Sequence, residues 1–193
     1  MRRRQKSAAV VLAVFLLAAV LLTGCGGKNP ELDRAMALRA KLLTADCTFE
    51  AEITADYGDE LQEFTMDCTG DNQGNLKFSV TEPESISGIT GSASEAGGAL
   101  TFDDVALHFH LMAQDALSPV SAPWIFLKTL RSGYIVSACY EEELLHLSID
   151  DSFEDDALRL DIWLEEGSFP IRAEILHDGM RILTLTIGNF QIL

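Results

Sequence analysis

Basic residues are scarce in this chain of 193 residues, which has 14 Lys and Arg against 30 Asp and Glu and a formal net charge of −16. A surface of this sign repels phosphate backbones and anionic headgroups, which argues against nucleic acid as a partner and against electrostatic adsorption to membranes. The sequence also lacks Gly-x-Ser-x-Gly, His-Glu-x-x-His and a phosphate-binding loop. We therefore expect neither enzyme activity nor a cofactor.

The first 24 residues have the layout of a secretory signal. A basic cluster precedes an apolar run over residues 8–22, which is shorter than the roughly 20 residues that span a bilayer. The run ends in Leu-Thr-Gly-Cys at 22–25, which resembles the lipobox of bacterial lipoproteins. This resemblance implies removal of residues 1–24 and acylation of Cys25, with chains such as palmitate. The alternative is an uncleaved membrane-spanning anchor.

The sequence after the signal predicts one domain. Residues 25–29 form a short tether, and residues 30–193 are long enough to bury a single hydrophobic core. We expect the protein on the extracytoplasmic face of a bacterial membrane. The lipid must hold it there, because the acidic surface does not favour adsorption.

Two hydrophobic periods follow one another along the domain. An approximate helical stripe over residues 32–43, begun by Pro30 and interrupted by Arg39, predicts an amphipathic helix. From Asp46 the period changes to two, and a turn centred on residues 57–58 predicts a β-hairpin with one apolar face. Further strands are predicted over residues 76–80, 89–94, 99–109, 134–140, 144–149, 157–164, 171–177 and 182–187.

A second helix is predicted midway through the strands. Pro123 in its first turn and Gly133 just past its last turn mark the two ends. Its apolar residues run nearly all round the helix, which indicates burial. The short strands with tight polar turns indicate an antiparallel meander, so the predicted fold class is α+β.

This order of elements resembles the LolA/LolB-like family of bacterial lipoprotein carriers and receptors. The resemblance covers residues 30–193 and implies a strongly curved antiparallel sheet, an incomplete β-barrel, with the N-terminal and inserted helices plugging its concave face. The chain looks closer to small LolA-like lipoproteins related to the spore-germination lipoprotein GerS than to a soluble carrier. A soluble carrier would lack Cys25.

Such a sheet leaves an apolar hollow that could hold a lipid or a hydrophobic segment of an envelope protein. This leads to a membrane-anchored, non-catalytic binding protein as the first hypothesis. The alternative is a structural or regulatory envelope protein with a filled core and a partner docked on its surface. Periodicity does not separate cavity residues from ordinary core residues. The residues expected near the cavity are Phe49, Phe64, Met66, Phe78, Trp124, Phe126, Leu127 and Leu130.

The cysteines of the first hairpin raise a separate hypothesis. With the turn centred on residues 57–58, Cys47 faces Cys68 on the apolar side, where a disulfide could form outside the cytoplasm. If the turn centre moves on by one residue, Cys68 faces Phe49 instead, and both thiols are free. Cys139 then has no partner in either register.

The histidines form no convincing metal site. His108 and His110 project from one face of a predicted strand, a geometry compatible with zinc. His146 and His177 lie on other predicted strands. With no third ligand nearby, we interpret these residues as surface histidines and expect no metal site.

Overall fold

A computed structural model describes the chain except for the N-terminal segment and a few internal gaps. The described residues are 29–56, 61–102, 105–109, 112–113, 116–165 and 169–193. The predicted signal and the lipidated Cys25 therefore lie outside the described residues. Residues 31–193 form one compact unit. Within the described segments, none of the helices combines the length and apolar character needed to cross a membrane.

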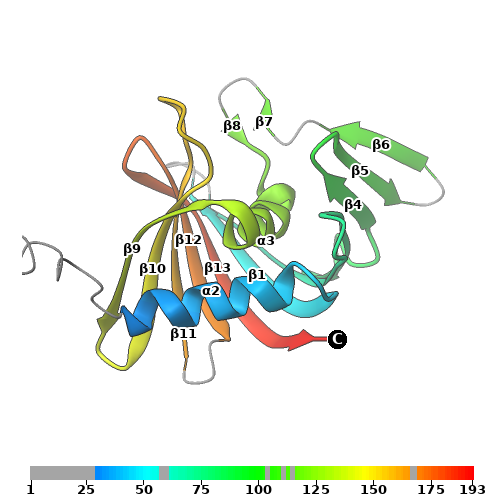
Figure 1. Ribbon diagram of the computed structural model, residues 1–193. Helices are drawn as coiled ribbons and strands as arrows, with labels where there is room; N and C mark the ends of the chain where they lie inside the picture. Colours follow the sequence, from blue (N-terminus) through cyan, green and yellow to red (C-terminus); the bar gives the residue numbers. More distant parts are fainter. Residues whose placement is uncertain (1–28, 57–60, 103–104, 110–111, 114–115, 166–168) are drawn as a thin grey trace, which may run out of the picture. The chain divides into compact units, whose positions relative to one another are not determined.

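An antiparallel sheet of eleven strands dominates this unit (Figure 1). The strands are β1 (Cys47–Asp56), β2 (Leu61–Gly70), β3 (Leu76–Glu82), β4 (Thr90–Ser94), β5 (Gly97–Phe102), β6 (Val105–Phe109), β9 (Tyr134–Glu141), β10 (Leu144–Asp150), β11 (Arg159–Leu164), β12 (Pro170–His177) and β13 (Met180–Ile192). Their spatial order is β6-β5-β4-β3-β2-β1-β13-β12-β11-β10-β9, so β6 and β9 are the open edges. Two short strands, β7 (Met112–Ala113) and β8 (Ala116–Leu117), pair separately.

Two helices lie on the same side of the curved sheet (Figure 1). Helix α2 (Pro30–Leu42) turns Ala35, Leu38 and Leu42 inward. A 3₁₀ turn, η1 (Pro119–Ser121), leads into helix α3 (Ala122–Ser132), which lies against the middle of the sheet. The predicted α+β fold, with a strongly curved open sheet and two helices on its concave face, is therefore confirmed.

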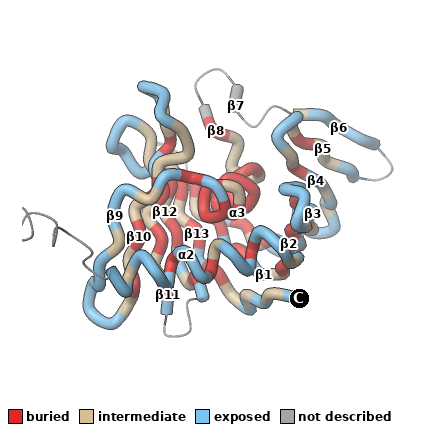
Figure 2. Tube along the Cα trace, viewed as in Figure 1, coloured by how far each residue is buried: buried red, intermediate tan, exposed pale blue. Residues whose placement is uncertain are grey.

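Burial alternates from residue to residue along the strands and so distinguishes the two faces of the sheet. Its concave face, which the helices cover, carries the buried alternate residues, and the opposite convex face is polar and partly exposed (Figure 2). The largest fully buried side chains on the concave face include Ile53, Met66, Leu76, Leu147, Ile149, Leu160, Ile162 and Leu164. The core thus lies between this face and the two helices.

One predicted strand is wrong. Residues 99–109 are not a single strand but belong to the hairpin of β5 and β6, in which Phe102 pairs with Val105. The apolar residues step from Leu100 and Phe102 to Val105 and Leu107 across two aspartates. This break in the alternation is the sequence signal for a chain reversal, although the long apolar stretch on both sides of it is typical of a single strand.

Candidate ligand-binding site

Helix α3 is the element that fills the hollow of the sheet. Pro123 occupies its first turn, and its last turn ends at Gly133, whose backbone N–H donates to the Thr129 carbonyl at 2.8 Å. Gly133 has extended backbone angles, so it does not serve here as a left-handed cap. It is needed because a Cβ would lie 2.6 Å from Ile149 Cγ2. The sequence signal located the helix end correctly, for a different physical reason.

The middle of α3 contacts the sheet through apolar side chains. The Phe126 ring meets the Phe49 ring edge-on, with centroids 5.6 Å apart and an interplanar angle of 71°. Gly70 on β2 makes room for Leu127, since a Cβ there would lie 2.2 Å from Leu127 Cδ2. The helix therefore sits directly on the sheet, at a spacing that a larger residue at position 70 would not allow.

All eight residues predicted near the cavity lie in this packed region. Their exposed fractions run from 0% to 8%, and none of them faces solvent to a substantial extent. Four come from strands (Phe49, Phe64, Met66 and Phe78) and four from α3 (Trp124, Phe126, Leu127 and Leu130). The structure brings them together as one core cluster. Their contact with a ligand stays a prediction.

Polar side chains tie α3 at its two ends. Near the first turn, Trp124 Nε1 donates to the Gly74 carbonyl at 2.9 Å. At the last turn, Arg131 Nη1 donates to the Asp71 carbonyl at 2.7 Å, and Arg39 Nε donates to the Leu130 carbonyl at 2.9 Å. The apolar middle of the helix thus lies between two polar attachments.

The buried arginines of this site were not predicted. Arg131 is only 7% exposed, and burial lowers the pKa of Arg39 below its ordinary value. Among the described residues, Arg39 Nη2, Arg131 Nε and Thr129 Oγ1 are buried without a hydrogen-bond partner. Such atoms are costly, at about 1–3 kcal/mol each. The interruption of the apolar stripe by Arg39 was the one sequence signal for them.

Two openings flank the helices. One of about 400 Å³ lies beside α3 and is lined by Trp124, Leu127 and Lys128 together with the turns that follow β2 and β4. The other, of about 510 Å³, lies beside the N-terminal half of α2 and is lined by Arg34, Tyr140, three leucines and two glutamates. Of the eight predicted cavity residues, Trp124 and Leu127 line the first opening. Both volumes fall within the range of small-ligand pockets, about 300–1,000 Å³.

Of the two registers considered for the first hairpin, the one that places Cys47 opposite Cys68 is wrong. Cys47 pairs with Gly70 and Cys68 pairs with Phe49, which is the alternative register. Both thiols are buried and free in the structure, so the facing pair on which the disulfide hypothesis depended is absent. Burial raises the pKa of Cys68, and it raises the pKa of Cys47 against the opposing effect of the Arg131 charge.

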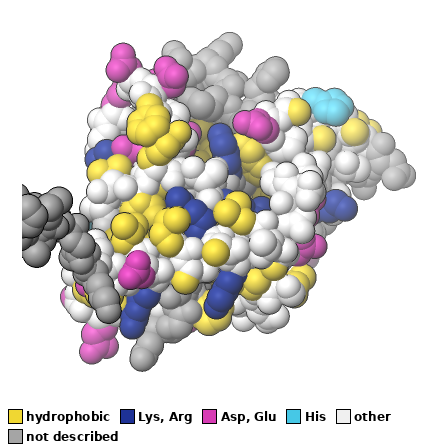
Figure 3. Space-filling view, viewed as in Figure 1, with side chains coloured by type: hydrophobic (Ala, Val, Ile, Leu, Met, Phe, Trp, Pro, Cys, Tyr) yellow, Lys and Arg dark blue, Asp and Glu magenta, His cyan; other side chains and the backbone are white. Residues whose placement is uncertain are grey.

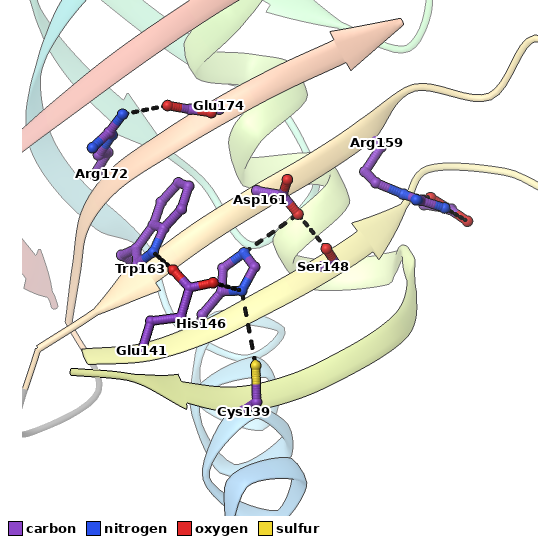
Figure 4. Close-up of polar contacts among 10 residues, drawn as sticks. Cys139, Glu141, His146, Ser148, Arg159, Asp161, Trp163, Arg172 and Glu174 are labelled. Atoms are coloured by element: carbon purple, nitrogen blue, oxygen red, sulfur yellow. Dashed lines mark hydrogen bonds and ion pairs between the residues drawn. The ribbon is translucent and has the colours of Figure 1, made fainter. Parts of the chain in front are cut away.

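The convex face holds a polar cluster that the sequence did not reveal (Figure 4). The His146 ring stacks on Trp163 and lies between two carboxylates, 3.2 Å from Glu141 and 3.4 Å from Asp161. The Ser148 hydroxyl donates to Asp161. A serine nucleophile needs a hydrogen bond to its histidine base. Here both groups contact Asp161 instead, so the arrangement is not that of a catalytic triad.

In the described part of the chain, the histidines are not grouped with other metal-ligand side chains. His108 is exposed on β6, and His110 lies outside the described residues. No group of three His, Cys, Asp or Glu side chains among the residues that the structure places could hold a metal ion.

No family model and no curated protein matches the chain. Among solved structures, it is similar to an uncharacterized conserved protein from Thermus thermophilus, with 11% sequence identity and a TM-score of 0.47 over 84% of this chain and 87% of that chain. It is similar to a putative outer membrane lipoprotein-sorting protein domain from Vibrio parahaemolyticus, with 10% identity and a TM-score of 0.44 over 84% and 92%. It is also similar to the lipoprotein LppX from Mycobacterium tuberculosis, with 15% identity and a TM-score of 0.41 over 84% and 96%.

Proposed function

We propose that this protein is a membrane-anchored, non-catalytic lipoprotein of the cell envelope that binds an acyl chain or a hydrophobic partner segment between the concave face and α3. The lipobox at residues 22–25 supports the anchor. The way α3 is attached supports the binding site. A ligand takes the place of α3 against the sheet when that helix moves outward.

The attachment of α3 is the observation that carries this proposal. Its middle contacts the sheet through apolar side chains, and apolar contacts are not directional. Another apolar group can therefore replace the middle of the helix on the strands, while the hydrogen bonds of Trp124 and Arg131 to the turn after β2 are exchanged for bonds to water. At the last turn, the unpartnered atoms of Arg39, Thr129 and Arg131 regain water when the helix moves, which offsets part of the cost of opening.

The 400 Å³ opening gives a ligand its first contact. Trp124 and Leu127 supply apolar wall, and Lys128 lies 5.3 Å from the centre of the Trp124 ring. An acyl chain that enters here meets Trp124 and Leu127 of α3 before it reaches the rest of the core. The site thus extends inward from an existing opening.

A second function is favoured by a different observation. All eight predicted cavity residues are already packed at exposed fractions of 0–8%. A core that is filled in this way also fits a structural or regulatory envelope protein whose partner docks on the outer surface, with α3 permanently in place.

Native mass spectrometry of the full chain, extracted from membranes in mild detergent, tests both parts of the proposal. We expect a polypeptide that begins at Cys25, carries acyl groups on that residue and retains a further lipid adduct. A Cys25→Ser variant is the control for the anchor, because it leaves the domain unchanged. Acylated protein without any adduct, and without uptake of added fatty acid, would favour the second function.

A further inference from the structure

Helix α2 has a second apolar stripe, which is exposed. Its inward stripe is buried, but Leu32, Met36 and Leu43 are 37%, 48% and 53% exposed. Ala40 is exposed as well, and the Leu43 N–H still donates to the Arg39 carbonyl in helical fashion. At 100° per residue, these four residues fall within an arc of about 80°. They form the outward stripe of α2 (Leu32, Met36, Ala40 and Leu43).

The helix layer differs in charge from the rest of the chain. Helices α2 and α3 together carry five basic and two acidic residues, against 14 basic and 30 acidic in the whole sequence. Arg34 and Lys41 lie on the solvent side of α2, and Asp33 is the acidic side chain of that side. In Figure 3, dark blue and yellow side chains lie over the middle of this face. Arg39 is half-buried and Arg131 is buried. The exposed charges of α2 are therefore Asp33, Arg34 and Lys41, and the repulsion expected from the net charge of the chain is weaker over this helix.

The position of α2 in the chain limits what can cover the stripe. Pro30, its first residue, follows Cys25 by five residues. Five residues span at most about 18 Å when fully extended. If Cys25 carries the lipid, the N-terminus of α2 cannot be farther than this from the headgroup region. Other exposed apolar residues, such as Val105 and Val136, lie on strands remote in sequence from the tether.

We propose that the outward stripe of α2 docks on the surface of the bilayer that holds the lipid anchor. The inference rests on the anchoring part of the proposed function. The apolar side chains of the stripe enter the boundary between headgroups and acyl chains, while the opposite side of the helix, with Arg34 and Lys41, stays in water.

A fluorescent label on α2 tests the docking in the full acylated chain. The label is an environment-sensitive fluorophore on Met36→Cys, in a Cys139→Ser background that removes the exposed thiol. Glu52→Cys is the matched control, because Glu52 is exposed on the convex face of β1. In vesicles of phosphatidylcholine and phosphatidylglycerol, we expect a blue-shifted emission at position 36 and quenching by iodide about threefold weaker than at position 52.

Changes to the stripe make the test specific. Replacing Leu32 and Leu43 together by Asn should return the iodide quenching at position 36 to the level seen at position 52. Lys41→Glu is a control on the opposite side of the helix and should leave the protection at position 36 nearly unchanged. Equal quenching at the two positions in the acylated chain overturns the proposal. Protection without vesicles, together with the mass of a dimer, overturns it in favour of a second copy of the chain.

The intact mass of the same sample distinguishes a failure of the lipid anchor from a failure of the docking of α2. Acyl groups on Cys25 together with an accessible position 36 overturn the docking of α2 alone. Absence of the acyl groups overturns both the anchor and the docking that depends on it. Failure to find a lipid adduct under α3 leaves the readout at position 36 unaffected, because the label lies outside the core.

Discussion

The concave and convex faces of the sheet differ in burial and polarity. On the concave face, Phe49, Met66 and Leu147 are buried against the helices. On the convex face, the neighbours of such residues form exposed ion pairs, including Arg159 with Asp150 at 2.8 Å. Because neighbouring residues project to opposite faces, a single set of strands builds both an apolar binding surface and a solvated outer wall. Stability and ligand binding should therefore depend on the first face and hardly on the second.

The largest expected effect is on packing under α3. Phe126→Ala removes a fully buried ring that meets Phe49, and should lower the free energy of unfolding by about 3–5 kcal/mol. The matched variant Phe153→Ala removes a ring that is 80% exposed, and should change it by about 1 kcal/mol or less. Urea unfolding followed by circular dichroism measures both. Because Phe153 lies in the loop between β10 and β11, equal losses would show that burial under α3 does not set the contribution of a ring to stability.

A comparison of two glycines tests how closely the helix approaches the sheet. Gly70→Ala places a Cβ 2.2 Å from Leu127 Cδ2 and should destabilise the protein by about 1–3 kcal/mol. In Gly188→Ala the new Cβ lies 3.3 Å from the end of the flexible Glu50 side chain, so we expect little change. The same unfolding measurement applies. A tolerated Gly70→Ala would show that α3 lies farther from β2 than described.

The buried thiols predict a loss of stability at alkaline pH. Burial raises the pKa of Cys47 and of Cys68 in the folded protein, whereas unfolded thiols ionise at about pH 8.5. Above that pH the native state binds more protons than the unfolded state, so stability falls as pH rises, by at most about 1.4 kcal/mol per pH unit for a thiol that stays protonated in the folded protein.

Two alanine variants isolate this contribution. The double variant with Cys47→Ala and Cys68→Ala should show a shallower decline in unfolding free energy between about pH 8.5 and 10.5. Cys139→Ala is the matched control, because it removes an exposed thiol on β9 and leaves both buried thiols in place. Parallel declines in all three proteins would show that the two buried thiols ionise freely in the folded state.

The smallest expected effect concerns the convex ion pairs. Glu174 contacts both Arg172 and Arg181, whose side chains are about half exposed. Glu174→Gln should lower the free energy of unfolding by about 0.2–1 kcal/mol, and by less in 1 M salt. A loss as large as that of Phe126→Ala would mean that the convex face contributes to the fold as strongly as the core does.

Periodicity was sufficient to predict the helices, most strands and the set of residues on the concave face, because burial of one face imposes the pattern directly. It was not sufficient for register. The two registers of the first hairpin differ by two positions along a strand, so both keep Cys47 and Phe49 on the same face. The structure distinguishes them through the pairing of Cys68 with Phe49.

Tertiary contacts explain the residues that the sequence did not reveal. Arg131 is buried because its guanidinium reaches the Asp71 carbonyl, sixty positions away in the chain. His146 meets Asp161 and Trp163 only because β10 and β11 pair. Neither contact has a local sequence pattern, so the polar parts of the site could not be predicted from spacing.

The two tryptophans allow the central claim to be measured directly. Trp124 lies on α3 above the concave face, and Trp163 lies on the convex face beside His146. Trp163→Phe and Trp124→Phe leave one reporter on each side, and each variant is titrated with a fatty acid brominated on its acyl chain. If the ligand binds between α3 and the concave face, we expect saturable quenching of Trp124 and none of Trp163. Equal quenching of the two, or quenching of Trp163 alone, would contradict a ligand site between α3 and the concave face.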